Sequence, residues 1–193
     1  MSVRYVAFLR AINVGGHTVR MEDLRRLFES IGAANVQTFI ASGNVIFDST
    51  VNREADLERH IEAGLEKALK FPVATFLRTL PEVAAAARAP AFSEAEIAAA
   101  HALYVGFLKT APAKAARAAV SAASTATHRF RVEGREIYWL RLNLEEEYAA
   151  PKLDKAIGQT TFRNITTVRK IAAKYTGAPV EKKKSPSRSR SAH

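Results

Sequence analysis

The first 80 residues interleave short apolar runs with segments whose apolar side chains recur at helical spacing. Residues 3–9 are mostly apolar, which is typical of a buried strand. A helix is predicted next, because apolar side chains then recur three or four residues apart and Gly32 follows as a C-terminal stop: Met21, Leu24, Leu27, Phe28 and Ile31.

A hairpin, a second helix and a further strand complete this pattern. Residues 36–40 and 45–47 are β-rich runs, and the Gly43-Asn44 pair between them is typical turn chemistry. Four-residue steps then predict a helix on Leu57, Ile61, Leu65 and Leu69. Residues 73–77 predict another strand, so the expected order is β-α-β-β-α-β, followed by helices.

Two capping signatures mark the helices that follow. In Thr79-x-x-Glu82 and Ser93-x-x-Glu96, the hydroxyl and the carboxylate can each accept a backbone N–H of the other residue. They predict two separate helices, divided at Pro90.

The second half repeats features of the first. The segment Tyr5-Val-Ala-Phe-Leu-Arg-Ala11 reappears as Tyr104-Val-Gly-Phe-Leu-Lys-Thr110, and a hairpin follows at 130–132 and 137–142. An internal duplication is therefore predicted, with Arg10 aligned to Lys109 and Gly43 to Gly134. A clear fourth strand is missing, and residues 161–164 are expected to lead into a last helix on Ile165, Val168, Ile171 and Tyr175.

Several motifs carry a resemblance to a known family. Phe8-Leu-Arg-Ala-Ile-Asn-Val-Gly-Gly-His17, Met21-Glu-Asp-Leu24, Ser42-Gly-Asn-Val-Ile-Phe47 and Thr161-Phe-Arg-Asn164 with Thr167-Val-Arg-Lys170 are similar to the bacterial family known as domain of unknown function 1697. In that family Trp commonly follows the Arg-Asn pair, whereas Ile165 follows it here. The resemblance implies a two-repeat α+β fold with ferredoxin-like halves, and it implies no assigned activity.

The predicted fold class is α+β, with two ferredoxin-like βαββα(β) repeats from an internal duplication, each a two-layer α/β sandwich. The predicted domains are a first βαββαβ repeat at 1–80, a helical connector at 81–101 and a divergent second repeat at 102–176. Residues 177–193 are predicted to form a disordered basic tail.

Composition narrows the function classes. The chain has no Cys, so disulfides, thiolate metal sites and a Cys nucleophile are excluded, and no two of its five His stand at metal-ligand spacing. No metal site is expected, and no cofactor is indicated. The absence of a long apolar run or a charged-then-apolar leader predicts a cytoplasmic protein without a membrane segment.

The net charge of +10 is unevenly spread. Residues 181–193 contain five Lys or Arg and one Glu, so this segment has a net charge of +4 and accounts for four tenths of the net charge of the chain. This segment is either a weak, non-specific hook for nucleic acid or a solubilising terminus.

Polar residues are predicted to converge where the first strand ends. The two strands of a β-α-β unit run parallel, so this end shares an edge with the turn between the second and third strands. Free backbone amides with Arg, Asn and Ser donors indicate a pocket for an anion or phosphate ligand, formed by Arg10, Asn13, Gly15, Gly16, His17, Ser42, Gly43 and Asn44. His17 is the candidate general acid or base, although no reaction is assignable and enzyme activity is undecided.

The same topology predicts a second cluster of Lys109, Arg135, Thr161, Arg163 and Asn164. Structural explanations compete with both clusters: paired glycines can simply supply positive φ, Arg10 can tie loop carbonyls together, and Asn164 can cap a helix.

Two other function classes remain open. Leu103-Tyr-Val-Gly-Phe-Leu108 is similar to the first-strand motif of RNA-recognition motifs, but Gly134-Arg-Glu-Ile-Tyr-Trp-Leu140 lacks the partner motif. Both faces of the first strands are apolar, which predicts a sheet covered on both sides. A nucleic-acid-binding protein using basic loops and the tail is one alternative, and a non-catalytic interaction scaffold is the other.

Overall fold

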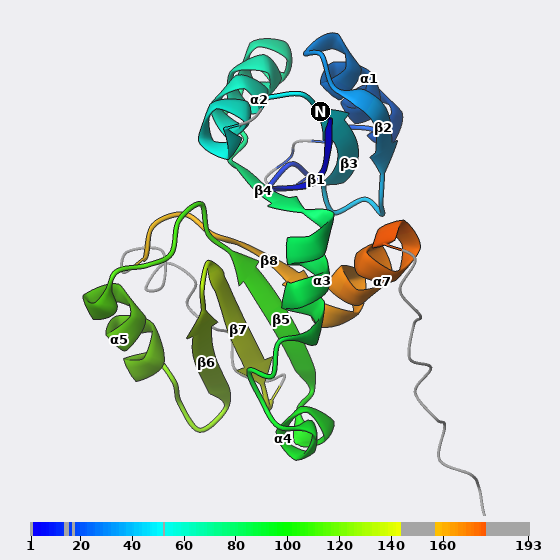
Figure 1. Ribbon diagram of the computed structural model, residues 1–193. Coiled ribbons are helices and arrows are strands. Elements are labelled where there is room, and N and C mark those ends of the chain that lie inside the picture. The colour runs from blue at the N-terminus through cyan, green and yellow to red at the C-terminus, as the bar shows by residue number, and fades with distance from the viewer. Residues whose placement is uncertain (1, 14–15, 17, 52, 144–156, 177–193) are drawn as a thin grey trace, which may run out of the picture.

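The computed structural model describes residues 2–13, 16, 18–51, 53–143 and 157–176. Two four-stranded antiparallel sheets with helices form an α+β fold (Figure 1). The first sheet contains β1 (Val3–Leu9), β2 (Ala34–Thr38), β3 (Asn44–Ser49) and β4 (Thr75–Thr79) in the order β2-β3-β1-β4. The second contains β5 (Ala102–Phe107), β6 (His128–Glu133), β7 (Glu136–Arg141) and β8 (Thr161–Asn164) in the order β6-β7-β5-β8.

Helices cover the sheets. In the first half these are α1 (Met21–Ser30) and α2 (Glu54–Leu69), and in the second half α5 (Lys114–Ala122) packs on β6. Between the halves lie α3 (Leu80–Arg88) and α7 (Ile165–Thr176), which contact each other extensively (Figure 1). The short α4 (Glu94–Ala99) precedes β5. No helix in the described ranges is both long and apolar enough to cross a membrane.

The sequence signals at the helix ends are confirmed. Both capping boxes form, at Thr79 for α3 and at Ser93 for α4, and Gly32 after α1 has a φ of +90°. A side chain is disfavoured at such a φ, so this turn favours glycine.

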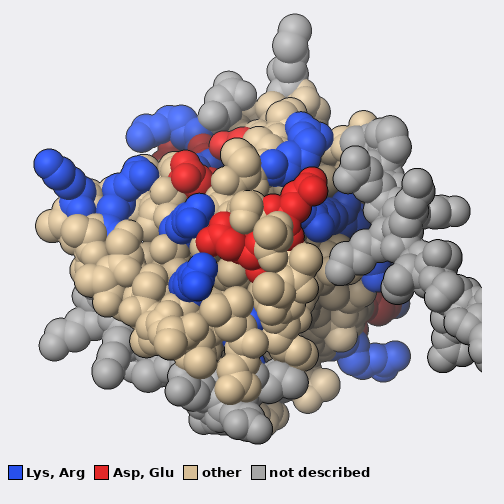
Figure 2. Space-filling model, turned by 90° about the horizontal axis from the view of Figure 1, so that it is seen from below, with Lys and Arg blue, Asp and Glu red and all other residues tan. Residues whose placement is uncertain are grey.

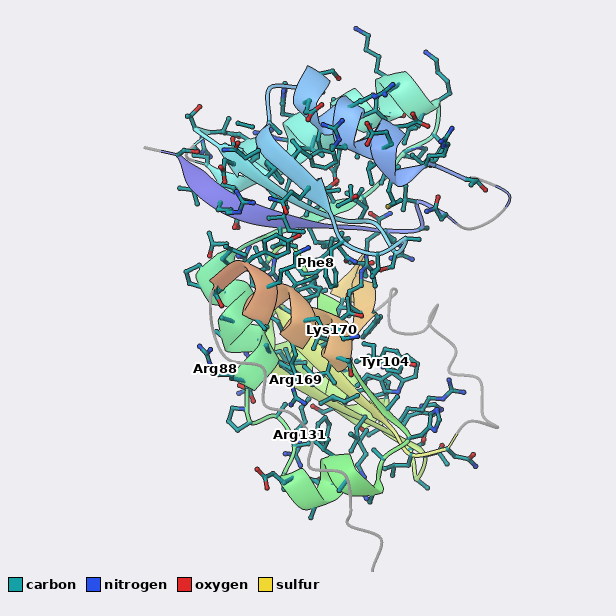
Figure 3. All side chains as sticks on the ribbon, turned by 90° about the vertical axis from the view of Figure 1, so that its right-hand side faces the viewer. Phe8, Arg88, Tyr104, Arg131, Arg169 and Lys170 are labelled. Carbon is teal, nitrogen blue, oxygen red and sulfur yellow. The ribbon has the colours of Figure 1, made fainter. Side chains whose placement is uncertain are left out.

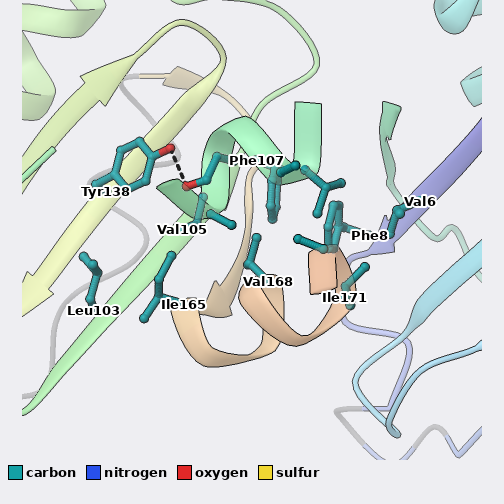
Figure 4. Close-up of a cluster of buried hydrophobic side chains, with 14 of the residues drawn as sticks. Val6, Phe8, Leu103, Val105, Phe107, Tyr138, Ile165, Val168 and Ile171 are labelled. Carbon is teal, nitrogen blue, oxygen red and sulfur yellow. Dashed lines mark hydrogen bonds between the residues drawn. The ribbon is translucent and has the colours of Figure 1, made fainter. Parts of the chain in front are cut away.

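A shared core fills the space between the two sheets. Val6 and Phe8 of β1 enter it from one side and Val105 and Phe107 of β5 from the other, together with α3 and α7 (Figure 4). The rings of Phe8 and Phe107 stack with centroids 3.9 Å apart. Alternate residues of β1 face α1 and α2 instead, where they join a second core cluster: Tyr5, Ala7 and Leu9. The first strand, β1, is therefore covered on both faces, as predicted.

The edge strand β4 is protected by carboxylates from α2. The backbone N–H of Leu77 donates to Glu58 at 3.0 Å, and that of Thr75 donates to Glu62 at 2.8 Å. Edge strands otherwise present unpaired backbone groups to other chains, so these bonds close that side of the sheet.

Two details of the predicted repeat are wrong. Residues 161–164 form β8, which pairs antiparallel with β5, although no clear fourth strand was expected in this half. Gly43 does not correspond to Gly134 in the strand register, because Asn44 pairs with Phe8 whereas Glu136 pairs with Phe107. The loop between β2 and β3 is longer than the loop between β6 and β7. Gly43 and Gly134 each lie four residues after an aromatic residue, Phe39 and Phe130, but aligning them shifts the strand register by one residue.

Candidate functional site

At the predicted glycine-loop edge, the Asn13 loop contacts the hairpin loop that carries Ser42, Gly43 and Asn44. Asn13 joins two loops, since its Nδ2 donates to the carbonyl oxygen of Ala41 at 3.0 Å and its Oδ1 accepts the N–H of Val19 at 2.7 Å. The N–H of Leu9 donates to the carbonyl oxygen of Gly43 at 2.8 Å. Gly16 is exposed at a φ of +88°. Gly15 and His17 lie outside the described residues.

Asn44 and Ser42 form hydrogen bonds within the fold. Asn44 is fully buried, and its Nδ2 donates to Ser42 Oγ at 2.8 Å and to the carbonyl oxygen of Phe39 at 2.9 Å. Its Oδ1 accepts a hydrogen bond from Arg163 Nε at 2.7 Å. This side chain therefore holds the hairpin loop and connects the two halves of the molecule.

Arg163, on β8, is buried at the junction between the halves and is 7% exposed. All five of its N–H donors meet neutral acceptors, namely Asn44 Oδ1, Thr161 Oγ1 and the carbonyl oxygens of Leu9, Gly43 and Phe162. Burial lowers the pKa of this guanidinium to about 10, so it stays charged at neutral pH. The sequence analysis placed Arg163 in the second cluster, whereas it contacts Asn44 and Gly43 of the first cluster.

Arg78, on β4, forms the matching contact in the opposite direction, and sequence reasoning missed it. Its side chain is fully buried, and Nη2 donates to the carbonyl oxygens of Leu108 at 2.8 Å and Arg135 at 3.1 Å. Its Nε bonds Glu136 at 2.6 Å. The signal that could have revealed Arg78 is a lone Arg directly after the apolar residues Phe76 and Leu77 and two residues before a helix. Arg163 also stands two residues before a helix, but it follows no apolar run.

Arg10 crosses the same junction as Arg163. Its Nη1 donates to the carbonyl oxygen of Thr160 at 3.0 Å, and its backbone N–H donates to the carbonyl oxygen of Ala74 at 2.9 Å. Arg10 is half-buried. Tying loop carbonyls together was one of the two roles considered for it, and these contacts fit that role.

Of the remaining residues of the second cluster, Lys109 and Arg135 lie together, since Arg135 Nη1 donates to the carbonyl oxygen of Lys109 at 3.3 Å. Both also have carboxylate partners. Lys109 pairs with Glu62 at 2.6 Å, and Arg135 pairs with Glu54 at 2.6 Å and Glu82 at 2.7 Å. Burial alone would lower the pKa of Arg135, but its two carboxylate partners raise it. Asn164 Oδ1 accepts the N–H of Thr166 at 2.8 Å, which is a helix-capping contact.

An open cavity of about 300 Å³ lies beside Lys109, where the end of β5 meets the segment before β8. Its walls combine apolar and polar side chains: Phe76, Leu108, Lys109, Thr110, Ile157 and Gln159. Lys109 has three N–H donors, of which Glu62 accepts one. In the described ranges no hydrogen bond engages the side chains of Thr110 or Gln159, and no group of three or more His, Asp or Glu could hold a metal ion.

The fold and the junction define an α+β protein in which two antiparallel sheets share one core and buried arginines reach across it in both directions. The chain belongs to the family described as Protein of unknown function (DUF1697), which matches residues 2–138. A conserved bacterial protein of Streptococcus pneumoniae, SP0830, has a similar structure, with a TM-score of 0.67 and 23% sequence identity over 89% of this chain and 98% of that chain. No curated protein sequence matches the chain.

Proposed function

We propose that the protein binds a small anionic ligand, a phosphate or a carboxylate with an apolar body, in the cavity beside Lys109. The observation that carries this proposal is the composition of the cavity wall. Lys109, Thr110 and Gln159 offer hydrogen-bond donors, and Phe76, Leu108 and Ile157 contribute apolar surface. Small-molecule sites commonly combine a largely apolar lining with a few polar groups that fix the ligand's orientation.

The glycine-loop edge is the weaker location for such a pocket. The polar atoms of Asn13, Asn44 and Arg163 already have partners within the fold, so a ligand would have to displace those bonds. Breaking a buried hydrogen bond leaves its partner unsatisfied, at a cost of about 1–3 kcal/mol. The ligand role of Arg10 and the glycine loop stays a prediction.

The proposal is tested by calorimetric titration with phenyl phosphate, using phenol as the uncharged probe of similar shape. Binding of phenyl phosphate and not of phenol is expected, and Lys109→Ala should weaken it at least about tenfold, the range of a lost charge-assisted hydrogen bond. Lys114→Ala, which removes an exposed cation at the start of α5, is the matched control and should bind as the parent does.

Glu62 provides a second, opposite test. Glu62→Gln removes the carboxylate that competes for Lys109 while keeping an oxygen for the N–H of Thr75. Phenyl phosphate should therefore bind more tightly to this variant than to the parent. Equal binding by the parent and Lys109→Ala, or no binding by the parent at millimolar concentration, would contradict the proposal.

We further propose that the two halves are ferredoxin-like units derived from one ancestral unit by duplication. Three observations support this: the strand order is equivalent in the two sheets, Phe8 stacks on Phe107, and Arg78 and Arg163 make reciprocal contacts from the fourth strands. The carbonyls that accept those contacts belong to Leu108 and Leu9, which the sequence repeat also aligns.

A further inference from the structure

Four basic side chains from α3, β6 and α7 lie on one face of the molecule: Arg88, Arg131, Arg169 and Lys170 (Figure 3). Two of them are placed there by hydrogen bonds. Arg169 Nε donates to the carbonyl oxygen of Ala87 at 3.4 Å, and Arg131 Nη1 donates to that of Ala91 at 2.5 Å. We call these four residues the basic cluster.

Part of the positive charge of the basic cluster is not balanced by an acidic side chain among the described residues. Arg131 is balanced by Glu96 at 3.3 Å, but no hydrogen bond or ion pair in the described part of the chain engages Arg88 or Lys170. The helix α7, which carries Arg169 and Lys170, contains no acidic residue at all. On the face seen in Figure 2, by contrast, acidic side chains lie among the basic ones. The basic cluster therefore has an excess of exposed positive charge.

We propose that the basic cluster binds the phosphate backbone of a nucleic acid without reading its sequence. Three of its four cations are Arg, whose planar guanidinium matches the geometry of phosphate. Neutralising several backbone phosphates is sufficient for non-specific binding. The sequence after α7 also continues into a segment with five Lys or Arg between residues 181 and 193, which adds charge of the same sign.

A membrane surface would require a different surface composition. Proteins that lie on bilayers insert apolar side chains between the headgroups in addition to their basic residues. The large hydrophobic side chains exposed in the described ranges are Val3, Ile40 and Val51, none of which belongs to α3, α4 or α7. The observations therefore favour nucleic acid as the partner.

The test is fluorescence anisotropy of a labelled 20-base-pair DNA duplex and a 20-nucleotide single-stranded RNA, titrated with the full chain between 50 and 300 mM salt. In the triple variant Arg88→Ala, Arg169→Ala, Lys170→Ala we expect affinity at 100 mM salt to fall at least about tenfold. The slope of log affinity against log salt should become shallower by about 2 to 3, because each lost phosphate contact contributes about 0.9.

A matched control removes three exposed cations from α1 and α2, in Arg26→Ala, Arg59→Ala, Lys67→Ala. It should keep the parent slope. The double variant Arg88→Ala, Lys170→Ala leaves the Arg169 bond to α3 intact, so it distinguishes lost binding from lost folding, and its slope should fall by about 2.

Three results would overturn the proposal. Equal slopes for the parent and the triple variant would assign any binding to residues outside the cluster, and equal losses in the control variant would reveal only a net-charge effect. Binding to vesicles containing phosphatidylserine, with none to either nucleic acid at the same salt, would identify a membrane surface instead.

Discussion

Glu58 is a carboxylate placed in an apolar setting by the packing of α2 on β4. It is 4% exposed and accepts the N–H of Leu77. Burial raises its pKa from the ordinary value of 4.5, and the Leu77 hydrogen bond and the attraction of Lys109 oppose this only in part. The folded protein therefore retains this proton to a higher pH than the unfolded chain does.

This shift predicts how stability depends on pH. Because the folded pKa is raised, the contribution of Glu58 to stability is complete below about pH 4.5 and is lost as pH rises through the folded pKa. Glu58→Gln should thus be more stable than the parent at pH 7, on the order of 1 kcal/mol, while its advantage disappears near pH 4. Urea denaturation from pH 4 to pH 8 measures the difference.

Glu66→Gln, at an exposed position of the same helix, is the control and should show no such trend. A Glu58→Gln advantage that is negative at pH 7, or that does not change with pH, would contradict the assignment.

Arg78 and Arg163 explain why parts of the junction could not be predicted from the sequence. In β8 the buried positions are Thr161 and Arg163, while Phe162 between them is only partly buried. This inverts the usual pattern of apolar residues facing inward, so period-two analysis finds no strand there. The burial of Arg78 and Arg163 is stabilised by carbonyl groups from the opposite half. The hydrophobic pattern of one half contains no information about partners in the other.

At the scale of elements, local signals were reliable wherever neighbouring residues determine the structure. The capping boxes of α3 and α4, the glycine stop after α1 and the contact of Asn13 with the hairpin loop at Ala41 all follow from spacing and strand direction. The cavity beside Lys109 could not be predicted from the sequence. Gln159 and Ile157 join its wall only through the packing of the segment before β8.

The two capping boxes offer a matched pair of substitutions. Thr79 begins α3, five of whose residues are buried in the shared core, whereas α4 behind Ser93 buries none. Thr79→Ala should destabilise the protein by about 1–2 kcal/mol, and Ser93→Ala by clearly less, because fraying of α4 exposes little apolar surface. Chemical denaturation of both variants measures this. Equal losses would mean that packing of α3 does not strengthen the effect of its cap.

At the scale of the whole molecule, the two sheets are linked by a core to which both halves contribute side chains. The shared core includes residues from β1, β3, β4 and α3 as well as from β5, β7 and α7. Arg78 and Arg163 add reciprocal hydrogen bonds to the backbone of the opposite half. Separating the halves would expose this core to water and break the hydrogen bonds of Arg78 and Arg163 to the opposite half. The structure therefore favours unfolding as one unit.

The single tryptophan makes this cooperativity measurable. Trp139 lies in β7, stacked on Tyr104 with ring centroids 4.9 Å apart, and reports on the second half alone. Leu24 is a fully buried residue of α1 in the first half, and its core cluster contains no residue of the second half. Leu24→Ala should cost about 3 kcal/mol, and the urea midpoint reported by Trp139 fluorescence should fall as far as the midpoint reported by far-UV circular dichroism. Val120→Ala truncates a fully buried side chain in α5 and should lower both urea midpoints to the same extent. If Leu24→Ala instead leaves the Trp139 midpoint unchanged while Val120→Ala lowers it, the halves unfold independently and the shared core does not couple them.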